Sequence, residues 1–377
     1  MSGLQVTFDH LSHTTNEAAV EVLSGALSTD APGVRAKAVQ ALLVRQSEKS
    51  AKLLISKWAR LDAEHHELVR PAAAWMLPFV SDSLQGPEAT IIKGLQVASD
   101  LRLTPLIDRM ASLAETGKTK EIRNAATNSV SQISDHLGSE ARRTRPSTSV
   151  RVKCTVRLHE SVRRYSLHQN HRLVESFLAC STWADNELRK AFSPESDVAT
   201  VLVKQLEASE NPGVIELLAS AIHRRDIPDC VAQVIETRSD AAFRTAFLTA
   251  LGSNPNATTL NNLRELQGLA CCQGGINRLQ EVEHQDRPAF LHARSVTTAT
   301  TPSSENWLDS LAIACRAVLE REHGNHSRSE KTCDLTSAAV SVFQNCAPLP
   351  ATVWLTAAKI IASDDDYGIE NDVRANL

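Results

Sequence analysis

The sequence predicts an all-α protein whose helices form repeated hairpins stacked as a right-handed α-solenoid, with one short strand in a central basic insertion. Two observations lead to this fold class. The 377 residues include only 14 Gly, 14 Pro, 2 Tyr and 8 Phe, a composition that disfavours β-sandwiches and barrels. An apolar pattern with helical spacing also recurs along the chain, and its copies are separated by short turns rich in Asp, Asn, Pro and Gly.

The clearest copy of this pattern runs from Asp30 to Leu42. Within it, Val34, Ala38, Ala41 and Leu42 have the spacing of one apolar helix face. A helix can bury such a face only against neighbouring helices, which is the physical basis of a stacked repeat. The other four copies begin at the apolar residues Val69, Ile122, Val214 and Phe243, which correspond to Val34. In four of the five copies an arginine directly follows this apolar residue.

This pattern resembles the second helix of HEAT repeats, which are armadillo-type helical repeats, over roughly residues 16 to 252. The resemblance implies stacked HEAT-like helix hairpins and, by analogy, a surface that binds another protein. Two positions depart from the pattern. Pro71 should shift or kink the helix of the second copy, and Ile215 replaces the recurring arginine in the fourth.

Turn and capping residues predict the helix boundaries. One hairpin has a helix from Thr104 to Glu115, a stop at Gly117 and a second helix from Thr119 to about Ser134. Two further hairpins follow, with helices at 197–208, 213–224, 228–237 and 240–252.

We therefore divide the chain into four parts. N-terminal HEAT-like repeats occupy residues 1–138, and a basic insertion or linker occupies residues 139–175. A second HEAT-like block covers residues 176–294, and a Ser- and Thr-rich linker separates it from a C-terminal helical cap with an acidic tail at 305–377.

The basic insertion is the candidate binding segment. Between residues 142 and 172 there are nine Arg or Lys residues and one acid, Glu160. Valine and other apolar residues alternate with polar ones from Val150 to His159, which predicts a strand with its cations on one face. Two interpretations stay open: an inserted, solvated loop whose charges balance acidic repeats nearby, or a contact surface for an acidic protein or a phosphate backbone. The candidate contact residues are Arg142, Arg143, Arg145, Arg151, Lys153, Arg157, Arg163 and Arg164.

Two His-Glu dyads, at His66 and His159, resemble the motifs with which deoxyhypusine hydroxylase, a HEAT-repeat enzyme, binds a di-iron centre. That family uses four such motifs, and this chain has two. His-x-x-His spacings also occur, but no Cys or carboxylate stands at ligand spacing to complete a site. We therefore expect no metal and no cofactor. The His-x-x-His pairs are His10 with His13, His168 with His171, and His323 with His326.

Other catalytic and targeting signatures are missing from the sequence. It contains no GxGxxG, P-loop, GxSxG or HExxH motif. The eight cysteines form no CxxC pair, as is usual for buried thiols in a reducing compartment, and there is neither a signal peptide nor an apolar run that could span a bilayer. We expect a cytoplasmic protein that does not contact membranes.

These observations favour a non-catalytic scaffold that binds a protein partner. The alternative is a nucleic-acid or polyanion-binding protein similar to the HEAT-like alkylpurine DNA glycosylases, which need a cationic concave face. A His-Glu metal hydroxylase is the third hypothesis.

Overall fold

The computed structural model describes residues 3–143, 149–193, 195–252, 255–266 and 268–272, together with residues 282, 283, 286, 289, 290 and 293. Within these residues the protein is all-α, as predicted, and contains no strand. The chain divides into two units, residues 1–188 and residues 189–377. The predicted linker at 295–304 and helical cap at 305–377 lie outside the described residues.

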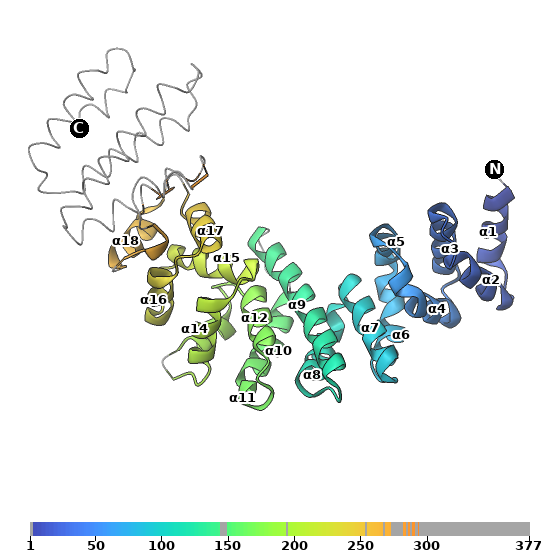
Figure 1. Cartoon of the computed structure of the whole chain (residues 1–377), viewed down its shortest axis with the longest axis horizontal. Helices are drawn as coiled ribbons and strands as arrows, with labels where there is room; N and C mark the ends of the chain where they lie inside the picture. Colours follow the sequence, from blue (N-terminus) through green and yellow to red (C-terminus); the bar gives the residue numbers. More distant parts are fainter. Residues whose placement is uncertain are drawn as a thin grey trace, which may run out of the picture. The chain divides into compact units, whose positions relative to one another are not determined.

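The first unit is a succession of helices (Figure 1). They are α1 (Gly3–His13), α2 (Ala18–Leu27), α3 (Pro32–Arg45), α4 (Glu48–Lys57), α5 (Ala63–Val69), α6 (Ala73–Ser83), α7 (Glu88–Asp100), α8 (Ile107–Thr116), α9 (Lys120–Arg143), α10 (Ser149–Arg163), α11 (Tyr165–His168) and α12 (His171–Cys180).

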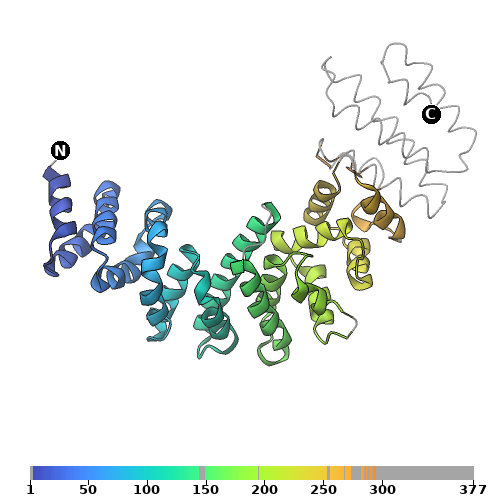
Figure 2. The same ribbon diagram turned by 180° about the vertical axis from the view of Figure 1, so that it is seen from behind.

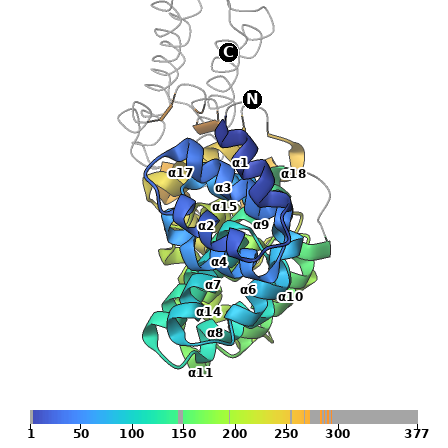
Figure 3. The same ribbon diagram turned by 90° about the vertical axis from the view of Figure 1, so that its right-hand side faces the viewer.

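These helices pack in the order in which they occur in the chain. The most extensive contacts join α8 to α9 and α9 to α12, followed by α7 to α9, α10 to α12, α2 to α3 and α1 to α3. The same order is visible from behind in Figure 2, and Figure 3 looks along the first unit from α1. Each hairpin is therefore stabilised by its neighbours, and the core is continuous from one hairpin to the next.

The second unit continues this arrangement within itself. Its helices are α14 (Ala199–Ala208), α15 (Pro212–Ser220), α16 (Asp229–Thr237), α17 (Ala241–Leu251) and α18 (Ala257–Glu265), and α13 (Asn186–Ala191) spans the boundary between the units. Among them, α15 packs on α17 and α14 packs on α16. None of the helices in the described parts of either unit is both long and apolar enough to cross a membrane.

Capping residues set many of the helix starts. The side chains of Ser47, Asp62, Asn211 and Asp240 each accept a hydrogen bond from a backbone N–H in the first turn of α4, α5, α15 and α17. The predicted hairpin boundaries hold to within a few residues, except that α9 continues to Arg143. Pro71 interrupts the second repeat as predicted: α5 ends at Val69, and a 3-10 turn precedes α6.

Arginine side chains join successive hairpins by donating to carbonyl oxygens near helix ends. Arg45 in α3 donates to Leu11 O, 2.8 Å away in the last turn of α1, and Arg70 donates to Asp100 O at the end of α7, 3.2 Å away. Such carbonyls have no partner within their own helix, and the helix dipole favours a cation there. In the second unit Arg238 donates to Leu206 O at the end of α14, 2.6 Å away.

The predicted strand over residues 150–159 is wrong, because these residues lie in α10. Arg151, Cys154, Thr155, Leu158 and Val162 are buried at spacings of one, three and four residues, which is a helical stripe. The valine and arginine residues happen to alternate, but contacts with α8 and α12 decide the conformation. The cations of this segment are therefore not on one face.

One glycine allows the close packing of α9 on α12. A Cβ atom at Gly138 would overlap the carbonyl oxygen of Ala179, a backbone atom that cannot move away cheaply. Gly25 in α2 is the opposite case, since a Cβ atom there would meet nothing within 4 Å.

We therefore predict that the same substitution has opposite effects at these two helical positions. Gly138→Ala should lower the free energy of unfolding by about 1–3 kcal/mol through overpacking. Gly25→Ala should raise it by about 0.5–1 kcal/mol, because alanine is the better helix former. Urea unfolding followed by circular dichroism measures both, and equal effects at the two positions would contradict the close approach.

Candidate interaction site

The cations of the basic segment, residues 142–172, divide into an inward and an outward set. Arg151 and Arg157 are buried, with exposed fractions of 1% and 9%, whereas Arg143, Lys153, Arg163 and Arg164 are exposed. Arg142 is half-buried and donates to Ala179 O, 2.9 Å away. Arg145 lies outside the described residues.

Arg151 forms a buried, two-bond ion pair with Asp185. Its two terminal nitrogens lie 2.6 and 2.7 Å from the two carboxylate oxygens, and one of them also donates to Cys180 O at the end of α12, 3.1 Å away. Asp185 further accepts from the backbone N–H of Thr182 at 2.7 Å. Each charge is therefore compensated, and the pair fixes the turn after α12 onto α10.

Arg157 belongs to a second network, which joins α10 to α8. Its guanidinium lies 3.0 Å from Glu115 Oε1, and the same oxygen accepts from Ser161 Oγ at 2.6 Å and from Arg164 at 3.1 Å. Burial alone would raise the pKa of Glu115, but the Ser161 hydrogen bond and the charges of Arg157 and Arg164 lower it below its ordinary value. Glu115 is thus an ionised, nearly buried anchor for three side chains of the basic segment.

Two thiols beside these networks are unsuited to act as nucleophiles. Burial raises the pKa of Cys154 to about 12 and that of Cys180 to about 11. Both thiols therefore stay protonated near neutral pH, and the thiolate is the reactive form.

The exposed side of α10 carries a different combination of residues. Val152 and Val156 are 40% and 39% exposed and lie one helical turn apart. Lys153 and Arg163 flank them, and neither has a partner among the described residues. We call Val152, Lys153, Val156, Glu160 and Arg163 the outer α10 surface. Leu167, which is 82% exposed, follows it in α11.

The first His-Glu dyad lies in a polar hollow of ≈ 320 Å³ between α5, α7 and α9. His66 stacks on the buried ring of Trp58, with 4.3 Å between ring centroids, and Trp58 donates to Asp100 at 2.7 Å. Glu67 pairs with Arg70. Both members of the dyad therefore have packing or ion-pair roles.

Arg102 and His136 complete the wall of this hollow. Arg102 has a left-handed backbone (φ 55°) and donates to His136 Nε2 at 2.9 Å. Burial, and then the positive charge of Arg102, lowers the pKa of His136, so the ring accepts this bond as neutral imidazole.

His159, His168, His171 and His13 also have contacts within the chain, and the pair of His323 and His326 lies outside the described residues. His159 of the second dyad stacks on Phe177, with 5.5 Å between ring centroids. His168 bonds to Ser161 O at 2.9 Å, His171 to Tyr165, and His13 to Asp9 O at 2.8 Å. Within the described part of the chain, no three His, Cys, Asp or Glu side chains are grouped so that they could hold a metal ion.

Comparison with known proteins does not assign the chain to a family. No protein-family model matches it. No curated protein matches it either.

Sequence reasoning located the segment but missed the partners of its arginines. Asp185 lies 34 residues from Arg151, and Glu115 lies 42 residues from Arg157, so no local spacing reveals either pair. The one available signal was the helical spacing of Cys154, Leu158 and Val162, which the alternation of valine and cations obscured.

We predict that Arg151→Ala lowers the free energy of unfolding by about 3–5 kcal/mol, because it leaves the Asp185 carboxylate buried without a counter-charge. Arg163→Ala, on the exposed side of the same helix, is the matched control and should change it by less than about 0.5 kcal/mol. Chemical denaturation of both variants at neutral pH measures the difference. If Arg151→Ala cost no more stability than the small change expected for Arg163→Ala, the buried ion pair would not stabilise the fold.

A second prediction concerns pH. Since the pKa of Glu115 is lower in the folded protein than its ordinary 4.5, its ionised form stabilises the fold above that pH, and the stabilisation is lost as pH falls through the folded value. Glu115→Gln should lower the free energy of unfolding by about 1–3 kcal/mol at neutral pH and by less near about pH 4. Urea midpoints at the two pH values test this. Glu121→Gln, at an exposed carboxylate in α9, is the control and should behave as the wild type does.

Proposed function

We propose that this chain is a non-catalytic scaffold of HEAT-like repeats that binds a protein partner, and that the outer α10 surface contacts an acidic and partly apolar segment of that partner. The observation that carries the proposal is the pair of exposed valines, Val152 and Val156, beside the unpaired cations Lys153 and Arg163. Sequential hairpins joined by arginine–carbonyl bonds support the HEAT-like assignment.

The composition of this surface favours a protein over a nucleic acid. A phosphate backbone binds through a series of cations, each neutralised phosphate contributing about −0.9 to the slope of log K against log salt. Here Arg151 and Arg157 are already neutralised by Asp185 and Glu115. The exposed valine side chains gain nothing from phosphate, but they lose water when they pack against an apolar residue.

Selection from a randomised peptide library on the full chain tests the proposal. Recovered peptides should combine acidic residues with apolar residues three or four positions apart. Lys153→Glu/Arg163→Glu should weaken their binding about tenfold, because it replaces attraction by repulsion. The matched control is Lys93→Glu/Lys204→Glu, which makes the same charge change at exposed lysines in other helices and should leave binding unchanged.

A salt titration against duplex DNA distinguishes the polyanion alternative. We expect no binding at about 50 mM salt. The nucleic-acid alternative would replace the protein-binding proposal if two results came together. Wild type would bind DNA and the Lys153→Glu/Arg163→Glu variant would not, while the selected peptides would bind both equally.

A further inference from the structure

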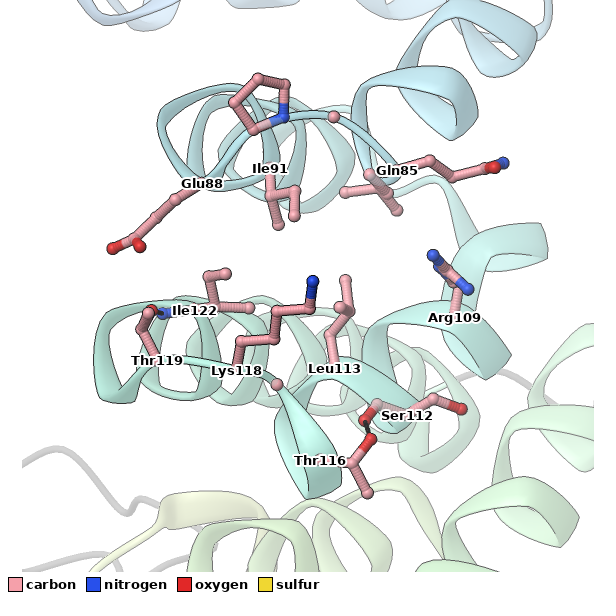
Figure 4. Close-up of a pocket in the computed structure, with 14 residues that line it drawn as sticks. Gln85, Glu88, Ile91, Arg109, Ser112, Leu113, Thr116, Lys118, Thr119 and Ile122 are labelled. Atoms are coloured by element: carbon pink, nitrogen blue, oxygen red, sulfur yellow. Dashed lines mark hydrogen bonds between the residues drawn. The ribbon is translucent and has the colours of Figure 1, made fainter.

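A groove in the first unit lies between two successive hairpin turns. The turn from α6 to α7 forms one wall, and the turn from α8 to α9 forms the other, with α8 along one side (Figure 4). Its volume is ≈ 480 Å³, within the range of roughly 300–1,000 Å³ that ligand pockets occupy. It shares no residue with the outer α10 surface.

Apolar side chains from three helices line the interior. Ile91 from α7 faces Leu113 from α8 and Ile122 from α9 across the groove (Figure 4). Gly117 keeps this wall close, because a Cβ atom there would lie 2.5 Å from Leu113 O and 2.9 Å from the Ile122 side chain. The turn therefore holds Ile122 against α8, and Leu113 is the most accessible of the three apolar side chains, since Ile91 and Ile122 are only 9% and 4% exposed.

Charged side chains on the rim give the groove two different ends. Arg109 and Gln85 lie at one end, Glu88 and Thr119 at the other, and Lys118 projects between them (Figure 4). Arg109 and Lys118 are exposed and have no ion-pair or hydrogen-bond partner among the described residues. This contrasts with Arg35, Arg45, Arg70, Arg151 and Arg157, whose guanidinium groups all donate within the chain.

We propose that this groove binds an extended segment of a partner protein in which a carboxylate side chain lies next to an aliphatic one. The carboxylate lies between Arg109 at one end and Lys118 in the middle of the groove, and the aliphatic side chain packs on Leu113 beside the edges of Ile91 and Ile122. Charge complementarity selects this occupant, because the two unpaired cations attract a carboxylate whereas the apolar side chains contribute nothing to a bare anion. Glu88 fixes the direction of the segment, since it repels a carboxylate at the opposite end.

The test is a peptide-display selection on the full chain, followed by binding measurements on variants. Peptides with adjacent acidic and aliphatic residues should be recovered, and Arg109→Glu/Lys118→Glu should weaken them about tenfold. Replacing the acidic residue of such a peptide by lysine should restore its binding to that variant. Because both substitutions are at exposed positions, circular dichroism should show an unchanged fold.

The two proposed surfaces serve as controls for one another. Lys153→Glu/Arg163→Glu should leave the groove-dependent peptides bound, so either proposal can fail without the other. Recovery of no peptide that depends on Arg109 and Lys118 would overturn the groove proposal. Equal binding of acidic and basic forms of a recovered peptide would overturn it as well, because the rim charges would then have no part in recognition.

Discussion

Arginine side chains that donate to carbonyl oxygens at the ends of neighbouring helices connect the hairpins of this protein. Arg45, Arg70, Arg142, Arg151 and Arg238 all make this contact, each to a carbonyl that lies 29 to 37 residues away in the sequence. The terminal carbonyls of a helix lack partners within that helix and carry the negative end of its dipole. A planar guanidinium with five donors can satisfy them and still bond a carboxylate, as Arg151 does with Asp185.

This use of arginine changes the meaning of a basic segment. Between residues 142 and 172 the charge suggests a polyanion site, but Arg151 and Arg157 are held by Asp185 and Glu115 inside the fold. What remains for a partner is smaller and of mixed character, since Val152 and Val156 are exposed beside Lys153. Local net charge therefore overstates the electrostatic attraction that this segment offers to nucleic acid.

Unpaired cations are informative in a chain where so many arginines have partners. Arg109 and Lys118 line a groove and have no partner in the described residues. Lys153 and Arg163, on the exposed side of α10, have none there either. Each pair adjoins aliphatic side chains. Two such surfaces in one unit fit a scaffold that binds extended or helical protein segments, because each combines apolar area with charges that set direction.

The sequence by itself determined the all-helical class, the apolar stripes such as that of Ala38 and Leu42, the break at Pro71, and the hairpin that turns at Gly117. These features depend on residues close together in the chain. The tertiary structure alone decided that residues 149–163 form a helix, that Arg151 and Arg157 point inward, and that Arg109 and Lys118 share a groove. The reason is that each of these features depends on residues far apart in the chain. Asp185 pairs with Arg151, Glu115 pairs with Arg157, and Ile91 lies across the groove from the helix of Arg109, and only the packing of the hairpins brings these residues together.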